Sequence, residues 1–270
     1  MNKTKEEKPW VLLNIAGIKY GISCEHVLSL NEIGKTTPFP RAPREIKGLV
    51  DFRGISVPLV DIKSILAAKS KETDLREFNT MMDARFQDHM NWLAALEKSV
   101  KENAEFKLTT DPHKCAFGRW YDSYDTKNSG IMFSITFSRF NFPHIAIHAI
   151  AKDAQAYMAN GEHDKAAALI EATREKELRQ MMGLFNDIKT AYKEVRREIL
   201  VTFGRGRSCV GIAVDEIVST ERLGEFDEKT LAGTCGGSKV LYGLGKRKSG
   251  EPVFLLNDEY FLETFTKALA

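Results

Sequence analysis

The chain lacks any apolar run long enough to cross a bilayer, and it lacks the marks of an export signal. None of its uninterrupted apolar stretches approaches the roughly 18 residues that a membrane-spanning helix needs. The N-terminal stretch MNKTKEEKPW is polar and has no apolar core of the kind found in signal peptides. The sequence therefore predicts a soluble cytoplasmic protein with no membrane insertion.

An excess of charge of either sign is also missing. The 39 basic residues are nearly balanced by 37 acidic ones, which gives a net charge of +2. This balance provides no electrostatic footprint for nucleic acid, so we expect no nucleic-acid partner. With 43% hydrophobic and 28% charged residues among 270, the composition is that of a folded globular protein rather than a disordered one.

Paired cysteines are absent too. The four cysteines are widely spaced and form no CxxC motif: Cys24, Cys115, Cys209 and Cys235. In a reducing cytosol this pattern argues against a disulfide framework and favours metal or redox chemistry for any special cysteine. Cys115 lies in the aromatic stretch DPHKCAFGRWYDSYD. Taken alone, that stretch is compatible with a buried thiol, a redox switch or a metal ligand.

What the chain does contain is β-type sequence at both ends and helical sequence between them. Apolar runs with glycine punctuation predict hairpins within residues 10–66 and again after Arg197. Apolar residues at three- and four-residue steps predict a helix from Lys71 to about Phe106, with His89 on its apolar face. Residues 111–143 are expected to be irregular. Two further helices are predicted over 143–161 and 162–199, the first beginning at Pro143.

Each β flank is short for an independent core, so the simplest architecture is one β domain interrupted by a helical insertion. This predicts an α+β protein with a first half-domain at 1–70, an inserted helical bundle at 71–197 and a second half-domain at 198–270. A linear array of three domains is the alternative.

The helical segment gathers residues suited to binding one metal ion. His144 and His148 are four apart on a predicted helix, so both imidazoles share one face. Imidazole nitrogen and cysteine thiolate are the ligands that zinc prefers, usually as a set of four. Cys115 supplies a thiolate and His89 a third imidazole. His113 lies two residues before Cys115 and is the competing candidate; a loop role near the site is expected for it instead.

The two flanks resemble the CheW family of chemotaxis coupling proteins. The resemblance is carried by GIKYGISCEHVLSL, PREIKGLVDFRGISVPLVDIKSIL, VGIAVDEIVS and LYGLGKRKSGEPVFLLNDEYFL, in that order. It implies two small SH3-like β-barrels, joined by a link into which the helical insert falls. It also implies binding of chemoreceptor cytoplasmic tips and the histidine kinase CheA. Arg53 falls on the family's Arg-Gly motif and Val27 on an apolar receptor-facing position, whereas Ser29 stands where the family often has an acidic residue.

The helical segment resembles the chemoreceptor zinc-binding (CZB) domain. HMNW, CAFGRW and HIAIH match that family's three-part motif in order and spacing. The resemblance implies a helical bundle that binds Zn²⁺ through His89, Cys115, His144 and His148. Gly118 belongs to the motif, and Trp92 and Trp120 are interpreted as walls that keep the site dry.

These patterns together predict a chemotaxis adaptor whose inserted domain senses zinc or oxidants. Four protein ligands leave no open metal position, and neither an HExxH motif nor a GxxxxGK[ST] phosphate loop is present. We therefore expect no enzymatic activity. The alternatives are a purely structural zinc in a scaffold protein, a metal-buffering protein and a zinc-dependent hydrolase. The unusually apolar stretch SGIMFSITFSRFNF is expected to pack against a partner or a second copy, which allows a homodimer through the helical domain.

Overall fold

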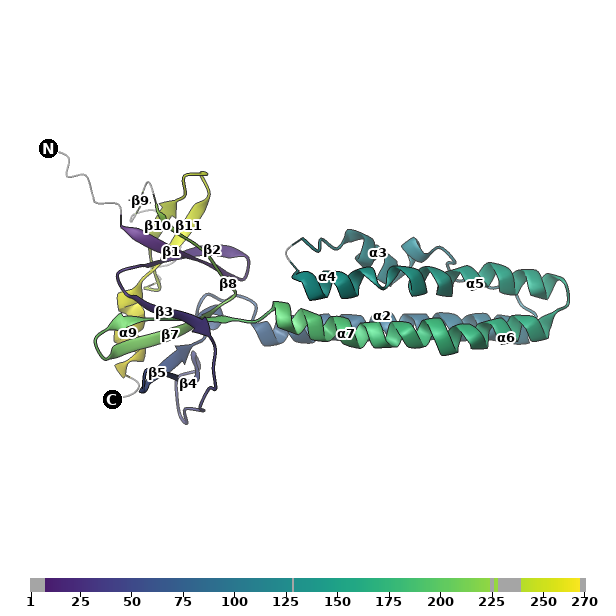
Figure 1. The fold of residues 1–270 in the computed structure, drawn as a ribbon, viewed down its shortest axis with the longest axis horizontal. Helices are drawn as coiled ribbons and strands as arrows, with labels where there is room; N and C mark the ends of the chain where they lie inside the picture. The colour runs from purple at the N-terminus through teal and green to yellow at the C-terminus, as the bar shows by residue number, and fades with distance from the viewer. Residues whose placement is uncertain (1–7, 128, 224–225, 228–238, 268–270) are drawn as a thin grey trace. The chain divides into compact units, whose positions relative to one another are not determined.

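The computed structural model describes residues 8–127, 129–223, 226–227 and 239–267. The chain divides into two compact units (Figure 1), one formed by residues 1–70 and 197–270 and the other by 71–196. We call them the β unit and the helical unit. Cys235 lies outside the described residues.

The β unit contains two sheets. The six-stranded sheet has the order β8-β1-β2-β11-β10-β9, and the five-stranded sheet has the order β3-β6-β7-β5-β4. The strands are β1 (Pro9–Ile15), β2 (Ile18–Ser23), β3 (Val27–Glu32), β4 (Ile46–Phe52), β5 (Ile55–Val60), β6 (Ile199–Arg205), β7 (Ser208–Val214), β8 (Glu216–Arg222), β9 (Phe226–Asp227), β10 (Leu241–Lys246) and β11 (Pro252–Leu256).

Both sheets combine strands from before and after the insertion. The parallel pair β2–β11 joins the two flanks in the first sheet, and the parallel pair β5–β7 joins them in the second. The prediction that the insert falls in the link between two barrels is therefore wrong. The insert separates β5 from β6, and both strands belong to the five-stranded sheet.

Strand register explains why an insertion is tolerated at this point. In β7, Ile212 is the partner of Val60, the last residue of β5, and Val214 is the partner of Ile199, the first residue of β6. The end of β5 and the start of β6 therefore lie at the same end of the sheet. Insertions are accommodated best where the two chain ends come close together.

A buried ion cluster lies at this end of the sheet. The short helix α1 (Ile62–Ile65) follows β5 and carries Lys63, which is 4% exposed. Its Nζ lies 2.9 Å from Glu198 Oε1 and 2.5 Å from Asp215 Oδ1. Glu198 directly precedes β6, so Lys63 ties the chain just before the insertion to the chain just after it.

Tight turns and apolar faces build the rest of the β unit. Arg53 and Gly54 connect β4 to β5 with φ angles of 53° and 79°, the positive values that a two-residue hairpin turn requires. The main core lies between the sheets and helix α9 (Asp258–Phe265), whose Phe261 is fully buried. Asn257 caps α9 by accepting from the amide of Tyr260.

The helical unit is a bundle in which α4 and α5 run along α7 and α6 (Figure 1). Its elements are α2 (Lys71–Lys101), η1 (Pro112–Lys114), α3 (Ala116–Ser123), α4 (Ile131–Ser138), α5 (Asn141–Ala159), α6 (His163–Thr173), the π-helical turn η2 (Arg174–Leu178) and α7 (Arg179–Val195). The prediction that residues 111–143 are irregular is wrong, because α3 and α4 form there. Among the described helices, none combines the length and hydropathy needed to span a membrane.

Candidate metal centre

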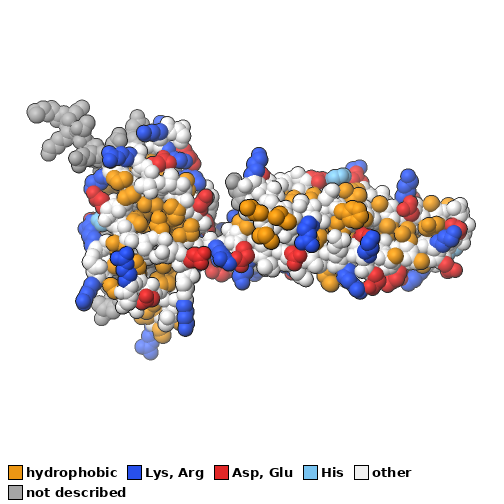
Figure 2. All heavy atoms as spheres, in the orientation of Figure 1, with side chains coloured by type: hydrophobic (Ala, Val, Ile, Leu, Met, Phe, Trp, Pro, Cys, Tyr) orange, Lys and Arg blue, Asp and Glu red, His pale blue; other side chains and the backbone are white. Residues whose placement is uncertain are grey.

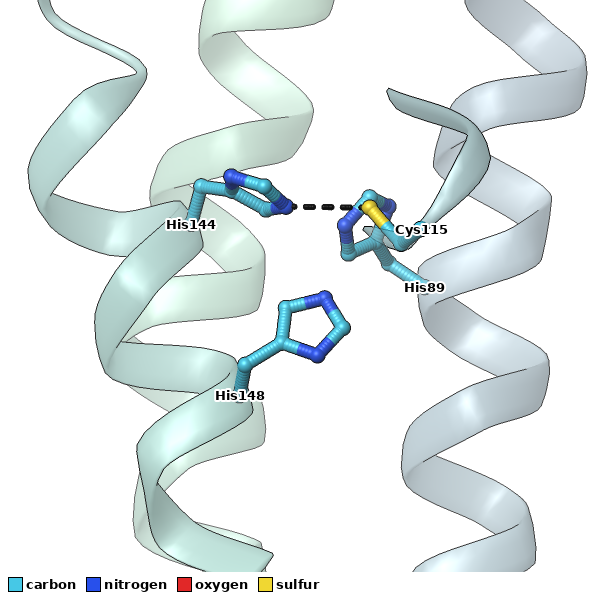
Figure 3. Close-up of side chains that lie close together, drawn as sticks. All are labelled: His89, Cys115, His144 and His148. Atoms are coloured by element: carbon cyan, nitrogen blue, oxygen red, sulfur yellow. Dashed lines mark hydrogen bonds between the residues drawn. The ribbon is translucent and has the colours of Figure 1, made fainter. Parts of the chain in front are cut away.

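Three segments of the helical unit bring four potential metal ligands together (Figure 3). His89 comes from the middle of α2, Cys115 from the residue before α3, and His144 and His148 from successive turns of α5. One ligand atom from each residue lies within 4.8 Å of the others. Cys115 Sγ is 3.2 Å from His144 Nε2. The structure thus assembles all four residues singled out from the sequence.

The histidines present free nitrogens in a buried setting. His89, His144 and His148 are 2%, 4% and 2% exposed. Nδ1 of His89 lies 2.7 Å from the carbonyl of Arg85, to which it donates, and this leaves Nε2 with its lone pair. That Nε2 and both ring nitrogens of His148 have no hydrogen-bond partner among the described residues. Buried polar atoms are rarely left unpaired, so these nitrogens indicate a missing ligand.

The electrostatics keep the imidazoles neutral, which is the form that binds metal. Burial, together with the neighbouring His89 and His148, lowers the pKa of His144 to about 3. Burial and His89 lower the pKa of His148 to about 4. The pKa of His89 is also lowered, chiefly by burial. Burial raises the pKa of the Cys115 thiol against the opposing effect of the Gly118 amide.

Local backbone geometry aims the Cys115 sulfur into the set. Cys115 is the N-cap of α3, and its Sγ accepts a hydrogen bond from the amide of Gly118 at 3.1 Å. A Cβ on Gly118 would lie only 1.9 Å from the carbonyl oxygen of Pro112. Only glycine lets η1 fold this closely over the first turn of α3.

Aromatic rings surround the four residues. The Trp92 ring lies 4.8 Å from that of His148, and its Nε1 donates to the Thr109 carbonyl at 2.8 Å, which holds the segment after α2 in place. Phe117 lies 4.9 Å from His144 and 5.7 Å from His89, between centroids. Trp120 packs against Phe117 at 5.6 Å, one layer further out. Phe117 is fully buried and contacts the histidines directly, which is the role expected of Trp120 from the sequence.

The other histidines lie outside the set. His113 is exposed, and its Nδ1 lies 2.8 Å from Asp122 Oδ2. His163 is an exposed residue at the start of α6. His26 is half-buried in the β unit, where it contacts Asp258 and accepts from Arg205 Nε at 2.8 Å.

The two candidate partner-binding residues both lie in the β unit. Arg53 is exposed at the β4–β5 turn, with its guanidinium 5.1 Å from the centroid of the Phe52 ring. Val27 begins β3, is half-buried and packs against the main core of the unit. Exposed apolar side chains follow it on the same edge strand at Leu28 and Leu30.

Comparison with known families agrees with this geometry. A family model for the chemoreceptor zinc-binding domain matches residues 89–155, a range that includes all four clustered residues, and a model for the CheW-like domain matches residues 9–90. The chain combines a CheW-like domain with a CZB domain. The CheW-like match stops short of β6–β11, yet these strands complete the sheets begun by β1–β5.

Other comparisons add less. No curated protein sequence matches the chain. Among solved structures, the scaffolding protein TtCheW from Thermoanaerobacter tengcongensis aligns over 97% of this chain and 91% of its own, at 10% identity and a TM-score of 0.41. That score is too low to establish a shared fold.

The donor set fits zinc. Histidine nitrogen and cysteine sulfur are the ligand types that zinc prefers, usually four in a tetrahedron, and the CZB family is a zinc-binding one. Such an ion would satisfy the free Nε2 of His89 and one of the two unpaired ring nitrogens of His148. A CheW-like domain and a CZB domain are binding modules, which supports a role as a chemotaxis scaffold.

Proposed function

We propose that this protein is a cytoplasmic chemotaxis adaptor that couples chemoreceptor tips to the histidine kinase CheA, with Zn²⁺ bound by His89, Cys115, His144 and His148. The observation that carries the proposal is the convergence of these four side chains in a chain that also contains a CheW-like domain. The bound ion would link α2, α3 and α5 and contribute to the folding of the helical unit.

Metal analysis of purified variants tests the ligand set. Wild type is expected to hold about one zinc per chain, whereas Cys115→Ala and His148→Ala lose most of it because a four-ligand site needs every donor. His113→Ala is the matched control, since it removes a nearby exposed histidine that points to Asp122. Wild-type zinc content in Cys115→Ala and His148→Ala would refute the assignment.

Partner binding is tested separately on the β unit. We assign the receptor contact to the turn that carries Arg53 and to the strand that begins at Val27. Two observations support this assignment: the CheW resemblance aligns both residues with positions expected to contact receptors, and Arg53 is exposed. Pull-down of CheA and receptor tips with wild type and Arg53→Asn measures the contribution. Failure of the wild type to retain either partner would contradict the adaptor role and leave a metal-buffering or structural protein.

The zinc site also has the chemistry of an oxidant sensor. Hypochlorous acid would transfer its oxygen to the Cys115 thiolate, giving sulfenic acid and chloride, with the sulfur supplying both electrons. Sulfenic acid is a poor zinc ligand, so oxidation would weaken the set. The test measures receptor–kinase binding before and after treatment with hypochlorous acid or a chelator. Unchanged binding after zinc loss would favour the alternative of a purely structural zinc.

A zinc-dependent hydrolase is the remaining alternative. It would need an open coordination position, whereas the four clustered side chains supply a full tetrahedral set. Hydrolase activity that depends on the zinc stoichiometry of the purified protein would favour it over the adaptor.

A further inference from the structure

The outer face of α4 and α5 carries an apolar seam with no partner in the described structure. Figure 2 shows hydrophobic side chains gathered over this part of the helical unit, and the exposed fractions are 79% for Ile131, 50% for Ile135, 68% for Phe142 and 41% for Ile145. Contiguous exposed apolar surface of this kind is uncommon in monomers and marks an interaction site.

The seam is continuous through the junction between the two helices. Arg139 and Phe140 keep right-handed helical backbone angles, and the amide of His144 donates to the Phe140 carbonyl. The helical phase therefore carries over from α4 to α5. Along this continuous helix the exposed residues of the seam are separated by alternating steps of four and three residues, which is the spacing of a coiled-coil seam. They are Ile131, Ile135, Ser138, Phe142, Ile145 and Ala149.

Charge is nearly absent from this stretch. Between residues 129 and 151, Arg139 is the only Lys, Arg, Asp or Glu. Its guanidinium lies 3.7 Å from Asp187 of α7, so the single charge beside the seam is neutralised within its own chain. A dry helix-to-helix contact over the seam would bury no unpaired charge.

The sizes of the side chains along the seam indicate that a second copy of this chain covers it. Two copies of the seam can pair antiparallel in a register centred on residue 140. In this register each residue faces the one for which the two residue numbers add up to 280, so Phe142 faces Ser138 of the second copy. In the same register Ile131 faces Ala149, and Ile135 faces Ile145. Large side chains thus meet small ones, and the two isoleucines meet each other. A parallel pair would instead set Phe142 against Phe142 and Ser138 against Ser138.

We propose that the α4–α5 seam is the interface of a two-fold symmetric, antiparallel homodimer. A self-complementary surface is what such an isologous contact requires. The seam lies on the same helix as His144 and His148, facing away from them, so each metal centre is one helix-width from the interface.

Sedimentation equilibrium of the full-length, zinc-loaded protein tests the surface. Wild type is expected to dimerise, and Ile135→Glu to raise the dimer Kd by about a hundredfold or more, because each dimer would bury two unpaired carboxylates. Ile18→Glu is the matched control, since Ile18 is an equally exposed isoleucine in the β unit, at 47%. Circular dichroism confirms that both variants fold. A monomeric wild type, or a dimer equally unaffected by both changes, would overturn the proposal.

Cysteine cross-linking tests the orientation. A mixture of Ile135→Cys and Ile145→Cys is expected to form an intermolecular disulfide that neither variant forms alone. In the antiparallel register, identical residues at either position are offset by about 15 Å along the axis, beyond the roughly 7 Å that a disulfide spans. Cross-links within each variant alone would show parallel pairing and refute the antiparallel seam.

Discussion

At the scale of single residues, Gly118 determines where the sulfur of Cys115 points. Its missing side chain allows the Pro112 carbonyl to lie where a Cβ would otherwise be. Gly118→Ala is expected to displace η1 and to reduce both zinc content and thermal stability of the helical unit. Zinc analysis and thermal unfolding measure the two effects.

Gly183 is the matched control for that substitution. It lies exposed inside α7, and a Cβ there meets no atom within 4 Å. Gly183→Ala is expected to leave zinc binding intact and to raise the free energy of unfolding by about 0.5–1 kcal/mol, because alanine is the better helix former. If both substitutions had the same effect, the close approach at Gly118 would not matter.

Lys63 is a second residue whose replacement is expected to have a large effect on stability. Lys63→Met leaves the buried carboxylate of Glu198 without its closest partner and is expected to cost about 3–5 kcal/mol of folding free energy. Lys8→Met breaks a solvent-exposed pair with Glu25 and should cost far less, because water and salt screen such a pair. Chemical denaturation of the β unit compares them, and equal losses would contradict the importance of the buried cluster.

The same lysine gives a pH dependence. Burial lowers its pKa, but hydrogen bonds from Lys63 to Asp215 and Glu198 outweigh burial, so its pKa is raised on folding. The stability that charged Lys63 contributes is therefore fully present below the pKa of lysine in the unfolded chain, about 10.4. It is lost as the pH rises through the higher pKa of Lys63 in the folded protein. Unfolding followed above pH 10 should show a loss in wild type that is absent in Lys63→Met.

At the scale of elements, the β4–β5 turn allows the proposed receptor contact to be tested separately from folding. Arg53 holds a left-handed conformation that asparagine adopts more easily. Arg53→Asn is therefore expected to preserve or slightly raise stability while weakening receptor binding. Binding assays and denaturation on the same sample measure both, and a loss of stability would show that the guanidinium has a structural role.

Some strands and helices could be predicted from the sequence, and others could not. Hairpins β1–β2, β4–β5, β6–β7 and β10–β11 were predictable, because glycine-containing turns separate apolar runs. Strands β3 and β8 were missed, because they are edge strands with largely polar sequences, VLSLNE and EIVSTER. The parallel pairs β2–β11 and β5–β7 leave no local signal, since their partners are far apart in sequence. Helix α4 was missed because its isoleucines, threonine and phenylalanines are not typical of helices.

For the candidate metal centre, the four clustered residues could be predicted from the sequence, but the aromatic packing around them could not. Ligand chemistry and spacing pointed to His89, Cys115, His144 and His148, and the structure brings them together. That Phe117 rather than Trp120 contacts the histidines depends on how α3 packs against α2 and α5. Spacing within a short motif does not determine such packing.

At the scale of the whole molecule, the two units have separate hydrophobic cores that share no residue. Metal removal should therefore act on one of them. A chelator is expected to lower the unfolding temperature of the helical unit and to leave that of the β unit unchanged, because zinc binds only the folded form of its site. Calorimetry with and without chelator measures this, with Cys115→Ala as the variant that should not respond. An equal downward shift of both transitions would contradict it.

The interleaving of the two sheets has a consequence for synthesis on the ribosome. Neither sheet can be completed by β1–β5 alone, since β6–β11 supply the remaining strands. Translation of the intervening helical unit takes on the order of ten seconds at about 5–20 residues per second. During that interval the apolar faces of the first five strands stay without their final partners. The helical unit, whose sequence is continuous, can fold first, so the four residues of the candidate metal centre come together before the sheets of the β unit are complete.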